Sequence, residues 1–257
     1  MIELYSKSEI EKIKKACQIV SDVLKYIASM VKPGVITYDL EMAAREKTKE
    51  LGGIPAFLNY QPPFSKKRYP AALCVSINDE VVHGIPSKTK KIKDGDLVSL
   101  DFGAIYDGYA GDAAMTIGVG DISLENRKLI EATKKALYEA IVQCKPGKYL
   151  YDIAKSIETV AKEYGFGIVC EYGGHGIGRN SHEEPFVANC TEVITSKMNA
   201  QLKPGMVIAI EPMFTTGNGA VYKANDGWTI KAKGKYACHF EHTVAILEDG
   251  PVVLTEW

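Results

Sequence analysis

KPGVITYDL (residues 32–40) and KDGDLVSLD (residues 93–101) both have similar counterparts later in the chain. They reappear as KPGKYLYDI (residues 145–153), 113 residues further on, and as KPGMVIAIE (residues 203–211), 110 residues further on. A K-P-G turn after a helix is common by itself, but two separate blocks at nearly one offset indicate a duplicated helix–helix–strand unit. We therefore expect one domain over residues 1–257, with similar halves at about residues 8–120 and 124–247. A site between such halves takes ligands from both, and the alignment places Asp101 opposite Glu211.

The hydrophobic spacing places the remaining elements around these blocks. A capping-box pattern at Ser8 and Glu11 predicts the start of a first helix, which ends at Lys32-Pro33-Gly34. Further helices are expected at about residues 39–51, 124–144 and 152–164. Strands are expected at residues 73–77 and 97–102, and a strand pair across residues 104–119 turns at Asp107-Gly108.

The overall composition excludes several classes of protein. The chain has 257 residues, of which 46% are hydrophobic and 25% charged, and its net charge is −1. This composition is ordinary for a globular protein, and the charge balance gives no global attraction to nucleic acid or anionic membranes. No apolar run reaches the length of a membrane span, and the charged N-terminal residues exclude a signal peptide. We therefore expect a cytoplasmic protein.

The cysteines and one basic run are interpreted conservatively. The six cysteines include no C-x-x-C pair, which disfavours both a zinc ribbon and a disulfide scaffold and favours reduced thiols. The basic run at residues 88–93 is interpreted as a solvated loop, and contact with ribosomal RNA is the alternative.

Four carboxylates stand in apolar surroundings on segments expected to be buried strands. A buried carboxylate is costly unless it is paired, and these segments hold too few cations to pair four of them. A metal ion is the strongest partner available, so the pattern predicts a metal site. The four residues are Asp101 in LDFG, Asp112 in GDAAM, Glu211 in IAIEP and Glu241 in FEHTVAI.

The histidines supply nitrogen ligands. His175 lies among glycines in GGHGIG, which leaves room for a ligand or metal beside its ring. His182 follows seven residues later, and His83 lies in VVHGIP. His239 stands two residues before Glu241 and faces the same side of a strand. For His239 we favour a structural or solvent role over direct contact with a metal ligand.

These ligand types predict the chemistry. Oxygen-rich sites with one or two imidazoles suit Mn(II), Fe(II), Co(II) or Zn(II) rather than a thiolate-type structural zinc site. Four negative charges exceed the charge of one divalent ion, so we expect two ions roughly 3.5–4 Å apart that share a bridging hydroxide. Such a pair lowers the pKa of bound water and polarises a carbonyl, which predicts hydrolysis of a peptide or an ester.

The ordered ligand set and its flanking signatures resemble the type I methionine aminopeptidases of the M24 metallopeptidases over essentially the whole chain. The set is Asp101, Asp112, His175, Glu211 and Glu241, and the signatures include VVHGIP, KDGD, HEEP, KPGM, IEP and DGWT. The resemblance implies the pita-bread fold, an α+β architecture of two pseudo-symmetric halves with helices packed outside a curved antiparallel sheet.

The resemblance also implies an activity. The initiator methionine of nascent polypeptides would be removed, with a small second residue preferred, by attack of a metal-bridging hydroxide on the first peptide bond. It implies a cytoplasmic monomer that meets its substrates at the ribosome and binds neither membranes nor specific nucleic-acid sequences.

The same resemblance implies a role for each ligand. Asp101 would bind one of the two metal ions through both oxygens, Asp112 and Glu241 would bridge, and His175 and Glu211 would bind the other. Glu211 would also take the proton from the attacking water.

The substrate-binding residues are implied in the same way. His182 would stabilise the tetrahedral intermediate, and His83 would bind the substrate and pass the proton to the leaving amine. The slot for the methionine side chain would be walled by Tyr60, Tyr69, Cys74 and Trp228, with Phe57 nearby, and sulfur–aromatic contacts favour a thioether there.

Two departures from the family pattern affect this slot. The stretch at residues 61–68 is longer than in common relatives, and Ser181 stands where they often carry an aromatic residue. From Ser181 we expect a pocket edge that is more open or more polar, whereas the longer stretch leaves the course of the pocket loop open at Tyr60.

Two other functions fit parts of the pattern. A proline-specific peptidase of the same fold would carry an extra N-terminal domain, for which Asp101 comes too early, and the aromatic slot fits methionine better. An interaction module on this fold would have lost metal ligands, whereas this chain keeps all five.

Overall fold

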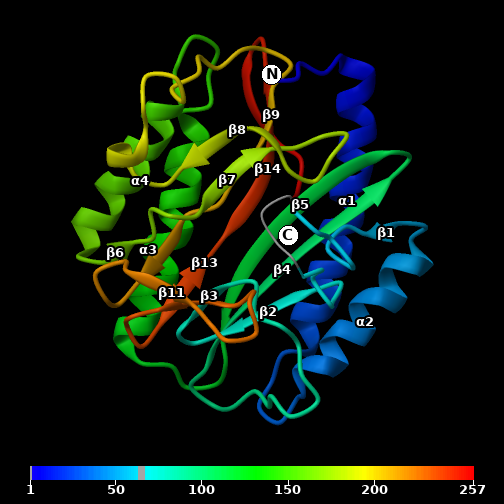
Figure 1. The fold of residues 1–257 in the computed structure, drawn as a ribbon, viewed down its shortest axis with the longest axis vertical. Coiled ribbons are helices and arrows are strands. Elements are labelled where there is room, and N and C mark those ends of the chain that lie inside the picture. Colours follow the sequence, from blue (N-terminus) through cyan, green and yellow to red (C-terminus); the bar gives the residue numbers. More distant parts are fainter. Residues whose placement is uncertain (1, 63–66) are drawn as a thin grey trace.

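The longest strands of the computed structural model, which describes residues 2–62 and 67–257, form a hairpin at its centre (Figure 1). Strand β4 (Leu97–Tyr106) pairs along its whole length with β5 (Tyr109–Gly118). Asp107 and Gly108 connect the two strands with φ angles of 48° and 76°. Two successive positive φ angles are the mark of a tight hairpin turn that matches the strand twist. The expected turn is thus confirmed, and the first strand is four residues longer than predicted.

A curved antiparallel sheet extends from this hairpin. Among the described residues it contains nine strands. Seven follow the order β1-β4-β5-β14-β9-β7-β8, β2 pairs with the first half of β4, and β15 pairs with β14. The other strands are β1 (Ile54–Pro55), β2 (Cys74–Ile77), β7 (Gly173–Gly176), β8 (Glu183–Ala188), β9 (Val207–Ile210), β14 (Glu241–Leu247) and β15 (Gly250–Val253). The contact between β5 and β14 joins strands from the two halves of the chain, so the centre of the sheet is where the halves meet.

Two smaller sheets frame one end of the large sheet. Strands β13 (Ala237–His239), β10 (Met213–Thr215) and β6 (Gly167–Ile168) form one of them. Strands β11 (Val221–Lys223), β12 (Ile230–Ala232) and β3 (Glu80–Val82) form the other. A single 3₁₀ turn, η1 (Thr191–Val193), follows β8.

Four long helices lie near their expected positions in the described chain. They are α1 (Lys7–Met30), α2 (Thr37–Glu50), α3 (Leu124–Val142) and α4 (Leu150–Tyr164). The capping box of α1 is formed by Ser6 and Glu9, two residues earlier than predicted, so the assignment to Ser8 and Glu11 was wrong. Ser6 accepts the backbone N–H of Glu9, whose carboxylate accepts the backbone N–H of Ser6, and both contacts satisfy helix-end donors.

The helices cover the outer face of the sheet (Figure 1). Helix α1 packs on β4 and β5, α4 packs on β8, and α3 packs against both α4 and the middle strands. Residues of α1 such as Ile13, Val20 and Leu24 are fully buried in these contacts. Each such aliphatic side chain contributes about 1.5–3 kcal/mol when it leaves water, so the helices hold the sheet in its curved form.

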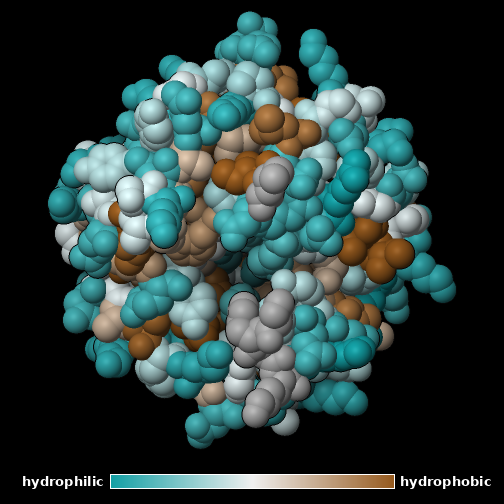
Figure 2. Space-filling model, turned by 45° about the horizontal axis from the view of Figure 1, so that its top comes forward, coloured by the Kyte–Doolittle hydropathy of each residue, from teal (hydrophilic) through white to brown (hydrophobic). Residues whose placement is uncertain are grey.

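The surface carries few apolar features on the face shown in Figure 2. Hydrophilic residues cover most of that face, and hydrophobic residues form small separate patches there. In the described chain, no helix has the length and apolar character needed to cross a bilayer. In the basic run at residues 88–93, Lys90 pairs with Glu80 at 2.8 Å, while Lys88, Lys91 and Lys93 are exposed as expected of a solvated loop.

A buried carboxylate on α2 fixes the chain that leads into β2. The side chain of Glu41 is 2% exposed and accepts the backbone N–H groups of Ala72 and Leu73 at 2.8 Å. Arg45, one turn later on the same helix, donates to it at 2.6 Å. The segment held in this way lies between Tyr69 and Cys74, two of the residues expected to line the substrate slot.

We expect Glu41→Ala to lower the free energy of unfolding by about 3 kcal/mol, because it leaves two buried backbone donors unpaired. Glu50→Ala is the matched control on the same helix, since Glu50 is 66% exposed in a surface ion pair with Lys47. The control should change stability by less than about 0.5 kcal/mol. Urea unfolding of both variants measures the difference, and equal losses would contradict the role assigned to Glu41.

Candidate metal centre

Strand register brings the predicted acids to one face at the centre of the sheet. Asp101 on β4 and Glu241 on β14 both pair with Ala114 of the intervening strand β5. Asp112 lies two residues before Ala114, so its side chain points to the same face. Because Ala114 carries only a methyl group, the three carboxylates converge above it.

The neighbouring strands complete the cluster. His242 pairs with Ile210 of β9, and this register brings Glu241 opposite Glu211, which directly follows β9. Strand β7 carries His175 beside β9. The Nε2 atom of His175 lies 3.8 Å from Oε1 of Glu211, and its Nδ1 atom lies 2.9 Å from the carbonyl oxygen of Gly176. Donation from Nδ1 to that carbonyl would leave the Nε2 lone pair directed at the cluster.

Unpaired oxygens show that the cluster fits a cation. Ligand atoms of Asp112, His175 and Glu241 all lie within 4.8 Å of one another. Oδ1 of Asp112 and Oε1 of Glu241 are buried, and neither has a hydrogen-bond partner within residues 2–62 and 67–257. Buried oxygens of this kind are costly unless a partner is bound, and carboxylates with an imidazole are the donor set that divalent transition metals prefer.

The acids perturb one another's protonation. Burial raises the pKa of Asp101 to about 7. Burial and the neighbouring carboxylates raise the pKa of Asp112 and of Glu241 well above the usual range. Glu211 differs: burial opposes its ionisation, but contact with His239 and the nearby imidazoles of His175 and His83 hold its pKa below the usual value. Glu211 is therefore the carboxylate best suited to remain ionised at neutral pH.

Two further histidines stand around the cluster. The ring of His182 stacks on that of His175 with centroids 4.1 Å apart, and on Tyr60 at 5.1 Å. His83 adopts a φ angle of 59°, a conformation that non-glycine residues seldom adopt and that recurs at functional sites. Loss of hydration lowers the pKa of His83 to about 4, so its ring is neutral at pH 7.

An apolar pocket adjoins the cluster. Tyr69 and Trp228 meet edge to face with centroids 5.2 Å apart, and Phe57 and Cys74 pack in the same group. Burial raises the pKa of the Cys74 thiol well above its usual range, so it forms part of an uncharged wall. The expected Tyr60 also lines this space, whereas residues 63–66 of the long stretch lie outside the described residues.

One cavity of about 500 Å³ is lined by every residue that the sequence nominated for the site. These residues are Tyr60, Tyr69, Cys74, His83, Asp101, Asp112, His175, His182, Glu211, Trp228 and Glu241. Sequence analysis missed Tyr172, Met213 and Ile230, which line the same cavity. Nothing in their local sequence distinguishes them from ordinary core residues, because only the packing of distant strands turns them inward.

Glycine is required on both sides of His175 for a different reason from the one expected. A Cβ atom at Gly174 would overlap the carbonyl oxygen of Ala209, and one at Gly176 would overlap that of Glu184. Strand β7 is thus squeezed between β9 and β8, and glycine permits this close approach. The space is used for backbone packing rather than for a ligand beside the ring.

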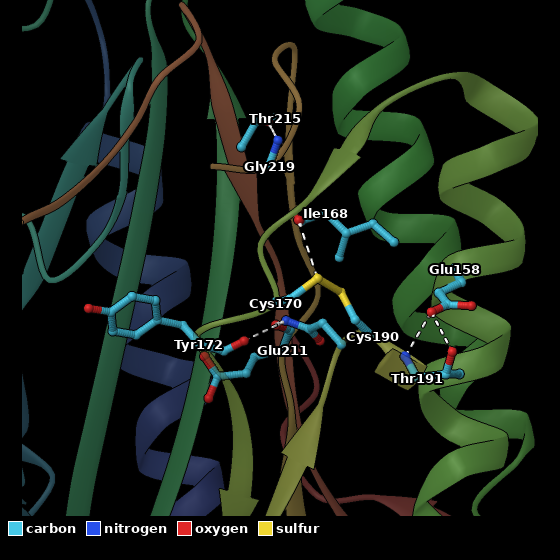
Figure 3. Close-up of a disulfide and its surroundings, with 10 residues drawn as sticks. Glu158, Ile168, Cys170, Tyr172, Cys190, Thr191, Glu211, Thr215 and Gly219 are labelled. Carbon is cyan, nitrogen blue, oxygen red and sulfur yellow. Dashed lines mark hydrogen bonds between the residues drawn. A yellow bond between two sulfur atoms is a disulfide. The ribbon is translucent and has the colours of Figure 1, made fainter. Parts of the chain in front are cut away.

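A disulfide joins Cys170 to Cys190, so the expectation of six reduced thiols was wrong for this pair (Figure 3). The pairing of Gly173 with Ala188 makes the segments before β7 and after β8 run side by side, with the two cysteine Cα atoms 5.4 Å apart. A separation of 20 residues gives no sign of this in the sequence. The other four cysteines are free and buried.

The residues beside the disulfide hold the site in place. The side-chain amide of Asn189 donates to the carbonyl oxygens of Tyr172 at 3.3 Å and Glu211 at 3.0 Å. On the other side, Thr191 donates through its backbone and its hydroxyl to Glu158 of α4, both at 2.7 Å (Figure 3). The segment after β8 therefore links α4 to the backbone of a predicted metal ligand.

His239 was expected in a structural or solvent role, and the structure contradicts only the solvent part. Its ring is 1% exposed, which excludes a solvent role, and Nε2 lies 3.4 Å from Oε2 of Glu211. The structure thus brings His239 directly behind a predicted ligand.

Comparison with known proteins agrees with this fold. The sequence pattern of metallopeptidase family M24 matches residues 11–248. A methionine aminopeptidase of Aquifex aeolicus is 60% identical, over 99% of each chain. The crystal structure of a methionine aminopeptidase from Thermotoga maritima superimposes with a TM-score of 0.93 at 40% identity and full coverage of both chains. A prolidase from Pyrococcus furiosus shares the fold with a TM-score of 0.79 at 27% identity, and the match covers 65% of that longer chain.

The fold and its ligand cluster thus define a metal-dependent peptidase of the pita-bread class. The chain belongs to metallopeptidase family M24, among the methionine aminopeptidases. The resemblance found in the sequence and the predicted α+β pita-bread architecture are both confirmed.

We expect Asp112→Asn to lose metal binding while it keeps the fold. Because the pKa of Asp112 is raised in the folded protein, its ionised form destabilises the metal-free state, increasingly so as pH rises above the unfolded value of about 4. The metal-free variant should therefore melt at a higher temperature than the metal-free wild type at pH 7.5. Added Mn(II) or Co(II) should raise the melting temperature of the wild type only.

Asp107→Asn is the control for this experiment, since Asp107 lies in the exposed turn of the same hairpin and forms a surface ion pair with Lys12. It should retain the full thermal response to metal. A normal metal response in Asp112→Asn would exclude Asp112 as a ligand.

We expect replacement of Cys170 and Cys190 by serine to lower the free energy of unfolding by about 3 kcal/mol, the chain-entropy value for a loop of 20 residues. For a domain of this size the melting temperature should fall by roughly 6–12 °C. Dithiothreitol should lower the melting temperature of the wild type to the same level and leave the variant unchanged. Identical melting of both proteins without reductant would contradict the disulfide.

Proposed function

We propose that the protein removes the N-terminal methionine from nascent polypeptides, with preference for a small second residue. The observation that carries the proposal is the shared cavity: a carboxylate–imidazole cluster fit for divalent metal and an apolar pocket line the same space. The 60% identity to the Aquifex aeolicus methionine aminopeptidase supports this substrate.

The cation site would use ligands from both halves of the chain. Asp101, Asp112, His175, Glu211 and Glu241 would hold two divalent ions, with Co(II), Mn(II), Fe(II) and Zn(II) as the candidates. Bound there, such ions supply Lewis-acid activation of water and of the scissile carbonyl. The buried, unpartnered oxygens of Asp112 and Glu241 support this assignment.

The remaining roles follow from protonation state and position. Glu211, the acid with a lowered pKa, would accept the proton released from the attacking water. His182, stacked over His175, would donate a hydrogen bond to the developing oxyanion. The ring of His83, which is neutral at rest, would contact the substrate, take up the proton accepted by Glu211 and pass it on to the leaving amine.

The pocket would select the first residue. Tyr69 and Trp228 pack edge to face in the same group as Cys74, and aromatic rings make favourable contacts with a thioether sulfur. Tyr60 would close the mouth of the pocket against His182. A large second residue would collide at this mouth, which accounts for the proposed preference for a small one.

The architecture is proposed to serve this site as one catalytic domain over residues 1–257. Its halves, at about residues 8–120 and 124–247, would be pseudo-repeats. Each opens with two helices and carries an acid at or just beyond a central strand, Asp101 in the first and Glu211 in the second. Nascent chains are the proposed partners, which places the enzyme as a monomer in the cytoplasm beside the ribosome.

Metal-dependent hydrolysis of two peptides tests the function. Chelator-stripped protein is supplied with Mn(II), Fe(II), Co(II) or Zn(II) and incubated with a Met-Ala-Ser peptide or with a Xaa-Pro peptide. We expect release of methionine from the first peptide only, and only with metal. The Asp112→Asn protein under the same conditions is the control for activity of the free ion.

Two results would overturn the proposal. Cleavage of the Xaa-Pro peptide alone would move the protein to the proline-specific branch that shares its fold. Absence of cleavage with every metal would favour the interaction-module alternative.

A further inference from the structure

His239 is fixed by its backbone independently of any ligand. Its N–H donates to Oγ1 of Thr116 at 3.0 Å, and the Thr116 hydroxyl donates to the His239 carbonyl oxygen at 2.8 Å. Ser99 on β4 bonds the same hydroxyl at 2.7 Å. His239 also pairs with Met213 of β10. The sheet therefore holds the backbone of His239 before any metal or substrate is bound, and the ring is enclosed at 1% exposure.

The ring of His239 lies close to the carboxylate of Glu211. Its Nε2 lies 3.4 Å from Oε2 of Glu211, and neither ring nitrogen meets hydrogen-bond geometry with any group in the described part of the chain. The other two buried histidines differ. His175 contacts the carbonyl of Gly176, and His242 contacts Oγ1 of Thr255 at 3.0 Å. An almost fully buried imidazole without a partner is costly, so its position beside Glu211 needs an explanation.

The carboxylate of Glu211 lies between two imidazoles. Oε1 is 3.8 Å from Nε2 of His175, on the side of the predicted metal ligands, and Oε2 is 3.4 Å from Nε2 of His239. The backbone of Glu211 is already held, because its carbonyl accepts from Asn189. The remaining freedom is rotation of the side chain, and a donor on Oε2 would remove it.

We propose that His239 is a positioning residue whose Nε2–H donates to Oε2 of Glu211 and so keeps Oε1 turned toward the cation site. Groups that orient metal ligands in this way typically change metal affinity by 10- to 100-fold. The inference rests on the proposed function, because it takes Glu211 as a ligand and proton acceptor.

Three substitutions at His239 separate the effect of the hydrogen-bond donor from the effect of side-chain size. In His239→Gln the side-chain amide N–H can stand where Nε2 stands. In His239→Asn the shorter amide cannot reach Glu211, although the residue remains polar and small enough for the site. His239→Leu removes the donor altogether. His242→Gln is the matched control, since it alters a buried histidine on the adjoining strand that contacts Thr255 and Trp257 instead.

The first readout is binding of Co(II) to the metal-free proteins, followed by calorimetry and by the visible absorption of the bound ion. We expect His239→Asn and His239→Leu to bind Co(II) about 10- to 100-fold more weakly and with altered absorption, whereas His239→Gln stays within about threefold of the wild type. His242→Gln should keep the wild-type affinity and absorption even if it melts at a lower temperature.

The second readout is kinetic. With saturating metal, His239→Asn should lower kcat for a methionyl peptide and leave KM nearly unchanged, because the pocket is intact. Wild-type Co(II) affinity in His239→Asn would overturn the proposal, as would equal losses in the Gln and Asn variants. Co(II) binding is measured without release of methionine. The binding results therefore test the role of His239 independently of the proposed substrate.

Discussion

Mutual repulsion between four buried carboxylates in one cavity is the constraint on which this structure depends. Asp101, Asp112, Glu211 and Glu241 line one cavity, and burial together with their neighbours raises the pKa of three of them. Such an arrangement opposes folding unless a cation compensates it. The protein therefore needs a frame rigid enough to hold the acids together while the site is empty.

This rigidity comes from the pairing of the strands and from side chains around the cluster. The register of β4, β5 and β14 fixes three of the acids above the methyl group of Ala114. Thr116 donates a hydrogen bond to the carbonyl of His239, and Asn189 donates one to the carbonyl of Glu211. The Cys170–Cys190 disulfide joins the segments on either side of β7 and β8. Thr116, Asn189 and the two cysteines are not among the predicted ligands, so much of the support comes from residues other than those that would carry the chemistry.

Much of the site was predictable because its residue types break local rules. An acid inside an apolar strand, as at Asp101 and Glu241, and a histidine among glycines, as at His175, are conspicuous in the sequence. Local rules also predicted the helices and the turn at Asp107-Gly108. They misplaced the first cap by two residues, because Ser6 and Ser8 both precede a helical pattern and only hydrogen-bond geometry distinguishes them. They missed Tyr172 and Met213, whose sequences look like ordinary core.

The sequence by itself determined the inventory: the five candidate ligands, the aromatic residues of the slot, the paired blocks and the family to which the chain belongs. Such properties depend on residue type and spacing, which are local. Only the tertiary structure decided which distant residues meet. It joined Cys170 to Cys190, placed His239 behind Glu211 and used the glycines of β7 for strand packing. These contacts follow from the register between strands far apart in the chain, and a shift of one residue would turn each of these side chains to the opposite face.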